Sequence, residues 1–131
     1  ICEENNCEAG IIDKNKFCYK AMCYETSNLI ASNLKLPDDK YSVCFQSRLD
    51  NKWLKPYTDK VMLNLIEEDY KKILILSPSF VSDCLETSIE ISERYKEVFI
   101  KQGGKEFKLV PSLNDNDIWV DAIIDIINFE A

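Results

Sequence analysis

The chain has 131 residues, 46% of them hydrophobic and 30% charged, and its 23 acidic and 16 basic residues leave a formal net charge of −7. This length fits one domain at most, or a piece of a larger one, and the composition excludes wholesale disorder. The acidic balance argues against nucleic acid or an anionic membrane as the main partner, and no run approaches the ~18 consecutive apolar residues of a transmembrane helix.

The first half of the chain is expected to contain an irregular segment, two helices and a strand. Its first residues are polar and have no sustained period, whereas the apolar side chains of residues 16–34 fall roughly on one helical face. Thr58 is a favourable N-cap for the second helix. The expected elements are an irregular segment at 1–15, a helix at 16–34, a turn at 35–40, a strand at 41–46, a loop at 48–58 and a helix at 58–69.

The second half is expected to alternate strands with helices. The apolar run ILIL suits a parallel strand that is buried on both faces. Gly103 and Gly104 follow a helical segment, so they are predicted to cap its C-terminus and not to bind phosphate. The expected elements are a strand at 73–76, a helix at 84–101, a strand at 107–110 and a helix at 118–128.

This alternation predicts an α/β fold, because strands that are joined by helices form a parallel sheet under right-handed crossovers. We expect a doubly wound, Rossmann-like sheet of three to four strands with helices on both faces. Three strands make a thin sheet, and the chain begins with Ile1 and not with Met. Both features lead us to expect that the chain is part of a longer protein.

The chain contains six cysteines and no histidine. Without histidine it cannot by itself complete a Ser-His-Asp triad, a Cys-His dyad or a zinc deaminase site. Four cysteines in the spacing C-x4-C-x10-C-x4-C lie near the N-terminus, where they could be metal or iron–sulfur ligands, disulfides or unligated thiols. These four are Cys2, Cys7, Cys18 and Cys23.

Ligands of an open parallel sheet bind beyond the carboxyl ends of its strands. The first such loop carries an arginine and aromatics, which suit a flat ligand with carboxylates or, more simply, a packed loop. The second loop leads to Glu86, Glu90 and Glu93, whose spacing predicts one stripe of an α-helix. That stripe could collect cations, pass protons or be a solvated helix face. The first loop contributes Gln46, Ser47, Arg48, Trp53 and Tyr57.

Three motifs in order, together with the helix that precedes them, resemble the ferrochelatase family over residues 16–131. The string FQSRLDNKWLKPYTD resembles the family's FQSR-x-G-x-x-W-L-x-P-x-T-D region, although Asp50 stands where many members have Gly. ILILSPSFVSDCLETSIEISERYKEVF resembles its buried strand, P-x-F-x-x-D-x-x-E-T motif and long helix. GGKEFKLVPSLNDNDIWVDAI resembles its ending, and NKFCYKAMCYETSNLIASNL resembles the helix that leads in.

The resemblance implies the C-terminal half of a bacterial lyase that inserts ferrous iron into a porphyrin in heme biosynthesis. Members have two Rossmann-like halves that face each other across a porphyrin cleft, and their catalytic histidine lies upstream of the segment matched here. We therefore expect a Cys-rich segment at 1–15 and a ferrochelatase-like domain at 16–131, with the N-terminal half absent. The fragment alone is expected to be inactive.

The resemblance also assigns site residues. The catalytic glutamate of the family corresponds to Glu86, and the acidic residues expected to bind the metal are Glu86, Glu90 and Glu93. Cys84 stands where many members have histidine, which puts a ligand or proton role there in doubt. The porphyrin contacts are then Gln46, Ser47, Arg48, Trp53 and Tyr57.

Some bacterial members hold a [2Fe-2S] cluster on an internal Cys-rich segment, and Cys2, Cys7, Cys18 and Cys23 lie at about that place. Cys18 and Cys23 can converge only if the helix begins after Cys18 or if one thiol reaches across. Cys44, in a strand, and Cys84, at the start of a helix, are poor candidates to join them. Bacterial membership implies a cytoplasmic protein that touches the inner membrane when it releases heme.

Other functions remain open at this point. A cobaltochelatase that acts on another tetrapyrrole is the nearest alternative, although the QSR…W…P-x-T-D pattern favours ferrochelatase. A non-catalytic porphyrin- or heme-binding module belongs to a different class, and a redox or structural module built around the four cysteines to a third. The expected partners are a porphyrin, ferrous iron and the missing N-terminal half, with no nucleic acid.

Overall fold

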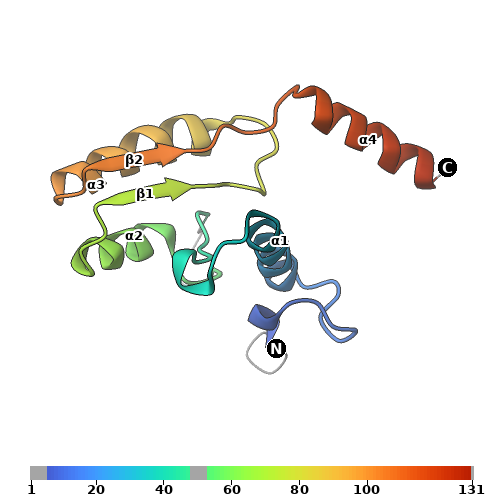
Figure 1. Cartoon of the computed structure of the whole chain (residues 1–131), viewed down its shortest axis with the longest axis horizontal. Helices are drawn as coiled ribbons and strands as arrows, with labels where there is room; N and C mark the ends of the chain where they lie inside the picture. The colour runs from blue at the N-terminus through green and yellow to red at the C-terminus, as the bar shows by residue number, and fades with distance from the viewer. Residues whose placement is uncertain (1–5, 48–52, 131) are drawn as a thin grey trace. The chain divides into compact units, whose positions relative to one another are not determined.

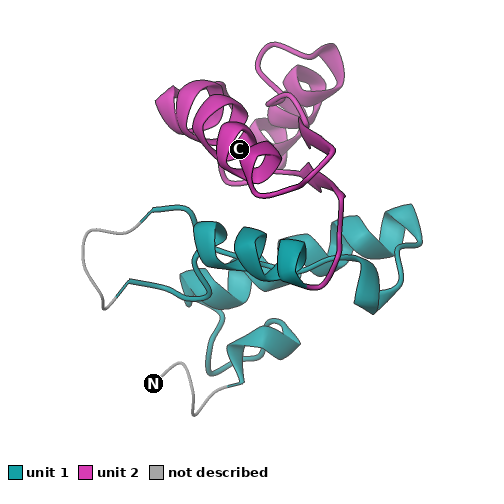
Figure 2. Cartoon of the chain, turned by 90° about the vertical axis from the view of Figure 1, so that its left-hand side faces the viewer, with its two compact units in different colours: residues 1–67 teal, residues 68–131 magenta. Residues whose placement is uncertain are grey.

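A computed structural model of the chain describes residues 6–47 and 53–130 (Figure 1). The chain divides into two compact units, Ile1–Glu67 and Glu68–Ala131, which are coloured separately in Figure 2. The boundary that the sequence predicts between residues 15 and 16 separates a Cys-rich segment from a family domain, and it stays a prediction. None of the helices in the described ranges is long and apolar enough to cross a membrane.

The first unit is built around the helix α1, Tyr19–Leu34. This helix begins later than the sequence predicts, because Cys18 keeps an extended backbone with φ −83° and ψ 117°. It ends at Lys35, whose left-handed backbone (φ 56°) lets its N–H bond back to the last turn. The other helices of the unit are η1, Cys7–Ala9, η2, Asp38–Lys40, and α2, Thr58–Glu67.

The strand predicted at residues 41–46 is reduced to a single parallel bridge between Phe45 and Tyr57. The Phe45 N–H donates to the Pro56 carbonyl at 2.9 Å, and the Thr58 N–H donates to the Phe45 carbonyl at 3.1 Å. A strand needs a neighbour along its whole length to satisfy its backbone groups, and here the bridge supplies one position only. The bridge nevertheless closes the loop 46–56 at its base.

The second unit is a β-α-β arrangement. Strand β1, Lys72–Ile75, pairs in parallel with β2, Glu106–Leu109, and the connecting helix packs against β2 (Figure 1). This confirms an α/β fold with a parallel sheet, but the sheet of the described residues has two strands and not three to four. The helices of the unit are η3, Glu86–Tyr95, α3, Lys96–Lys101, and α4, Asp117–Glu130.

The connecting helix differs from the regular α-helix that the sequence predicts. Its first part, η3, is a π-helix with i→i+5 hydrogen bonds, and only α3 is α-helical. The predicted cap is confirmed, because Gly103 has a positive φ of 99° and the Gly104 N–H donates to the Phe99 carbonyl at 3.0 Å. Such π-helical segments are rare and occur frequently at functional sites.

The core of the second unit centres on Phe99, which is completely buried and lies with its ring centroid 5.9 Å from that of Phe107. The Phe99 ring rests directly on Gly104, and a Cβ atom at Gly104 would overlap the ring carbons. The glycine is therefore required by packing and not by its backbone angles, since its φ is not positive.

We expect Gly104→Ala to lower the free energy of unfolding by about 1–3 kcal/mol, which is the usual cost of overpacking a core. Urea unfolding followed by circular dichroism measures the loss. In a Phe99→Leu background the same substitution should cost clearly less, because the smaller side chain leaves room for the methyl group. Equal costs in both backgrounds would show that the Phe99 ring is not what excludes a side chain at Gly104.

Candidate functional site

The predicted porphyrin contacts lie in the first unit, on the loop that the Phe45–Tyr57 bridge closes. Gln46, which follows the bridged Phe45, is half-buried, and Ser47 is exposed. Arg48 lies outside the described residues. The backbone bridge holds together the two described ends of this loop, residues 46–47 and 53–57.

The described part of this loop before the bridge carries aromatic side chains. Trp53 is 40% exposed, and many other large apolar side chains of the described residues are exposed as well. Lys55 Nζ lies 5.8 Å from the centroid of the Tyr57 ring, a cation–π contact. An exposed indole and a lysine held over a tyrosine ring are side chains that suit a flat, anionic ligand.

The predicted acidic residues lie in the second unit, where Glu86 is the first residue of η3. A hydrogen bond from the Cys84 thiol lowers the pKa of Glu86, and a bond from its own backbone N–H lowers it further. These bonds stabilise the ionised carboxylate, which is the form that attracts a cation.

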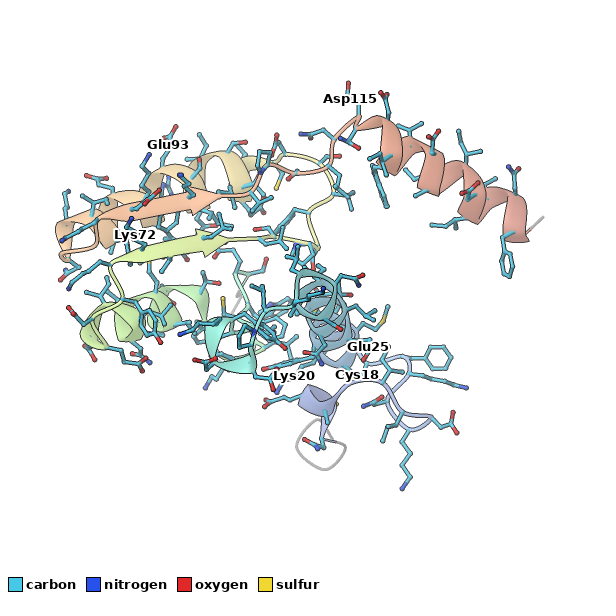
Figure 3. The ribbon with its side chains drawn as sticks, in the orientation of Figure 1. Cys18, Lys20, Glu25, Lys72, Glu93 and Asp115 are labelled. Carbon is cyan, nitrogen blue, oxygen red and sulfur yellow. The ribbon has the colours of Figure 1, made fainter. Side chains whose placement is uncertain are left out.

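The acidic stripe predicted for an α-helix does not carry over to η3. Each residue of a π-helix turns by a smaller angle than in an α-helix, so residues four or five apart stack and a residue seven apart is displaced to the side. Glu86 and Glu90 are half-buried, whereas Glu93 is exposed and stands on the outer side of the helix in Figure 3. The geometry thus groups Glu86 with Glu90 and separates Glu93 from them.

The first turn of η3 is held by Thr87, a residue that the sequence reasoning missed. Its side chain is 1% exposed, and its Oγ1 accepts a hydrogen bond from the Cys84 N–H at 2.9 Å. A threonine inside a helix gives no periodic signal, although a hydroxyl within the first turn is a known capping partner. Thr87 thereby fixes the backbone on which Glu86 stands.

Two of the four N-terminal cysteines are in contact. Cys7 Sγ lies 3.6 Å from Cys18 Sγ, and Cys7 is buried. Two thiolates bound to one tetrahedral metal ion at about 2.3 Å would lie about 3.8 Å apart, so this pair fits one edge of such a site. Cys2 lies outside the described residues, and among those that are described no three His, Cys, Asp or Glu side chains form a metal-binding group.

The described part of the Cys-rich segment, residues 6–15, packs against α1. Asn15 is buried, and its Nδ2 donates to the Gly10 carbonyl at 3.0 Å while its Oδ1 accepts from the Ile12 N–H at 2.7 Å. An ion pair of 2.7 Å joins Lys20 of α1 to Glu8 of η1. Although α1 begins only after Cys18, which is one of the two alternative conditions for convergence, Cys23 does not join Cys7 and Cys18 in a group of three among the described residues, so the expected approach of all the cysteines is not seen for Cys23.

Comparison with known proteins identifies relatives of this chain. A sequence model of the family described as Ferrochelatase matches residues 8–131. A ferrochelatase of Legionella pneumophila (strain Corby) is 49% identical over 119 residues, which cover 90% of this chain and 36% of the relative. A ferrochelatase of Coxiella burnetii (strain Dugway 5J108-111) is 47% identical over 124 residues, which cover 94% of this chain and 35% of the relative. The chain thus spans about a third of the length of these curated relatives.

Proposed function

The chain belongs to the ferrochelatase family, and from this premise we propose that it is the C-terminal part of an enzyme that inserts ferrous iron into a porphyrin in heme biosynthesis. The observation that carries the proposal is an identity of 47–49% over nine-tenths of the chain or more.

In this proposal Glu86 is the residue nearest to the chemistry. Insertion replaces two porphyrin N–H protons by one Fe²⁺ ion, so the site must attract a cation and accept protons. The lowered pKa of Glu86 suits the attraction of the cation, and the half-buried Glu90 adds a second negative charge on the same helix. Glu93, on the outer side, would collect iron at the surface.

The porphyrin would contact the loop of the first unit. Its macrocycle suits the exposed Trp53 and the half-buried Tyr57, and its propionates suit Arg48 and the polar Gln46 and Ser47. The exposed indole supports this assignment.

We also propose that a further segment of the protein completes the cleft, because the chain spans only about a third of the relatives. That segment would supply the catalytic histidine, and the complete half would have the doubly wound sheet of three to four strands. The two strands described here would then be its central β-α-β part.

Two further assignments accompany this function. Cys2, Cys7, Cys18 and Cys23 would hold a [2Fe-2S] cluster, which supplies a one-electron redox centre when it is bound, and the 3.6 Å contact between Cys7 and Cys18 supports this. The enzyme would be cytoplasmic and would touch the inner membrane when it releases heme. Bacterial relatives from Legionella and Coxiella support the second assignment.

Residues 1–131 alone are expected to form no heme from porphyrin and ferrous iron, whereas the full-length protein is expected to form it. The measurement is the appearance of heme absorbance with the loss of porphyrin fluorescence. Turnover by residues 1–131 would show that the catalytic machinery is placed wrongly. A full-length protein that binds porphyrin without turnover would support the binding-module alternative, and one that inserts cobalt but not iron would support the cobaltochelatase alternative.

A further inference from the structure

The loops that follow β1 and β2 in the second unit are joined by a reciprocal pair of side chains. The Asp83 N–H donates to Asn114 Oδ1 at 2.9 Å, and Asn114 Nδ2 donates to Asp83 Oδ2 at 3.0 Å. The backbone adds a third bond, from the Asn114 N–H to the Val81 carbonyl at 2.8 Å. The two loops are therefore held together by both the side chain and the main chain of one asparagine.

Asn114 suits this position for two independent reasons. Its backbone is left-handed, with φ 49°, a region that asparagine adopts more readily than most residues other than glycine. Its carboxamide offers an acceptor and a donor side by side, and Nδ2 also donates to the Ser112 carbonyl at 3.2 Å. Hydrogen bonds from Asn114 and Ser112 lower the pKa of Asp83, so the pair is charge-assisted at neutral pH.

The pair is continuous with the first turn of η3. Asp83 immediately precedes Cys84, whose N–H is bound by Thr87 Oγ1 at 2.9 Å and whose carbonyl accepts from the Ser88 N–H at 2.8 Å. The Thr87 hydroxyl also lies 3.4 Å from Asp83 Oδ1. Glu86 lies between these bonded residues, so any displacement of Asp83 would displace the carboxylate.

We propose that Asp83 and Asn114 are positioning residues that fix the first turn of η3, and with it the Glu86 carboxylate, relative to the end of β2. The inference rests on the proposed function, and it assigns neither side chain a contact with porphyrin or iron. Since a misplacement of about 1 Å can cost about a hundredfold in rate, the pair should act on kcat and not on KM.

The first test is Asn114→Asp in the full-length enzyme. This change removes both Nδ2 bonds and sets a second carboxylate against Asp83, so kcat for heme formation should fall by about tenfold or more while the KM for porphyrin stays within about twofold. Asn114→Gly should likewise lower kcat and leave KM nearly unchanged, because glycine adopts the positive φ but lacks the amide. Asp115→Asn, an exposed site in the same loop, is the matched control and should leave both constants unchanged.

The second test exchanges the partners. In the double variant Asp83→Asn with Asn114→Asp, a side-chain oxygen of residue 114 again accepts from the backbone N–H of residue 83, and an amide again donates to a carboxylate, with the two groups exchanged. Most of kcat should return. A double variant that is no better than Asn114→Asp alone would overturn the proposal, as would a single variant with unchanged kcat.

Amide hydrogen exchange over residues 84–90 separates this inference from the proposed function. Exchange there should speed up in Asn114→Asp and slow again in the exchanged pair, whether or not the protein makes heme. A wild-type protein that forms no heme would therefore end the proposed function, and unaltered exchange in Asn114→Asp would end the positioning role.

Discussion

Replacing Glu86 with Gln in the full-length enzyme is expected to lower kcat for iron insertion by about a hundredfold or more. The amide is nearly isosteric with the carboxylate, but it carries no negative charge and accepts no proton. The Cys84 thiol and the Glu86 backbone N–H would still have an oxygen to bond, so the turn should keep its shape. Heme formation at saturating porphyrin and iron measures the loss, and thermal unfolding should show little change.

Two neighbouring glutamates serve as controls for this prediction. Glu93→Gln removes the same charge from the same helix, but on its outer side, so it should weaken the use of dilute iron and leave kcat at saturating iron nearly unchanged. The loss of kcat in Glu90→Gln should lie between the losses in Glu86→Gln and Glu93→Gln. Equal losses of kcat in all three variants would indicate that only the total charge of η3 matters and that Glu86 has no special place.

The elements with strong periodicity could be predicted from the sequence, because their apolar spacing records which face is buried. The helix at 16–34 and the ILIL strand were predicted in this way, and their positions are confirmed within a few residues, as is the Gly103–Gly104 cap. The predicted burial of the strand on both faces is wrong, because Leu74 is 68% exposed. The π-helix could not be predicted. The choice between i→i+4 and i→i+5 hydrogen bonds depends on how the helix packs in the folded chain, which the sequence does not state.

Only those residues of the candidate site that belong to a sequence motif could be predicted. The resemblance placed Glu86 at the corner after β1, but the Asp83–Asn114 pair joins residues 31 positions apart, and two polar loop residues carry no period that could connect them. The strand at 41–46 has a suitable composition, yet it pairs at one position because strand formation depends on a partner elsewhere in the chain. Cysteine spacing likewise indicated a group of four without showing that Cys7 and Cys18 would meet.

The contact between Cys7 and Cys18 is the basis of a second prediction with a large expected effect. Cys7→Ser and Cys18→Ser in the full-length protein, purified without oxygen, are each expected to abolish the bound iron and sulfide and the visible absorption of a [2Fe-2S] cluster. A cluster of this kind needs four deprotonated cysteines, and these two sulfurs lie 3.6 Å apart, which suits two ligands of one iron. Iron and sulfide analysis with an absorption spectrum measures the outcome.

Cys44→Ser is the matched control for these variants. Burial raises the pKa of Cys44, so its thiol keeps its proton, and a protonated thiol is not a metal ligand. The substitution should therefore leave iron, sulfide and colour unchanged. Loss of colour in Cys44→Ser as well would indicate that the first unit has unfolded and that the effect is not specific to the ligands.

A wild-type protein that is colourless and free of iron, with four titratable thiols among the N-terminal cysteines, would contradict the cluster. Sulfurs 3.6 Å apart could then join on oxidation, because an ordinary disulfide needs them at about 2.05 Å and a small rotation of the side chains covers the difference. Air oxidation would remove two thiols from the wild type and none from Cys7→Ser, whereas a cluster protein would lose its iron and colour first. Either outcome concerns the first unit, and it leaves the role of Glu86 in the second unit to be decided by its own variants.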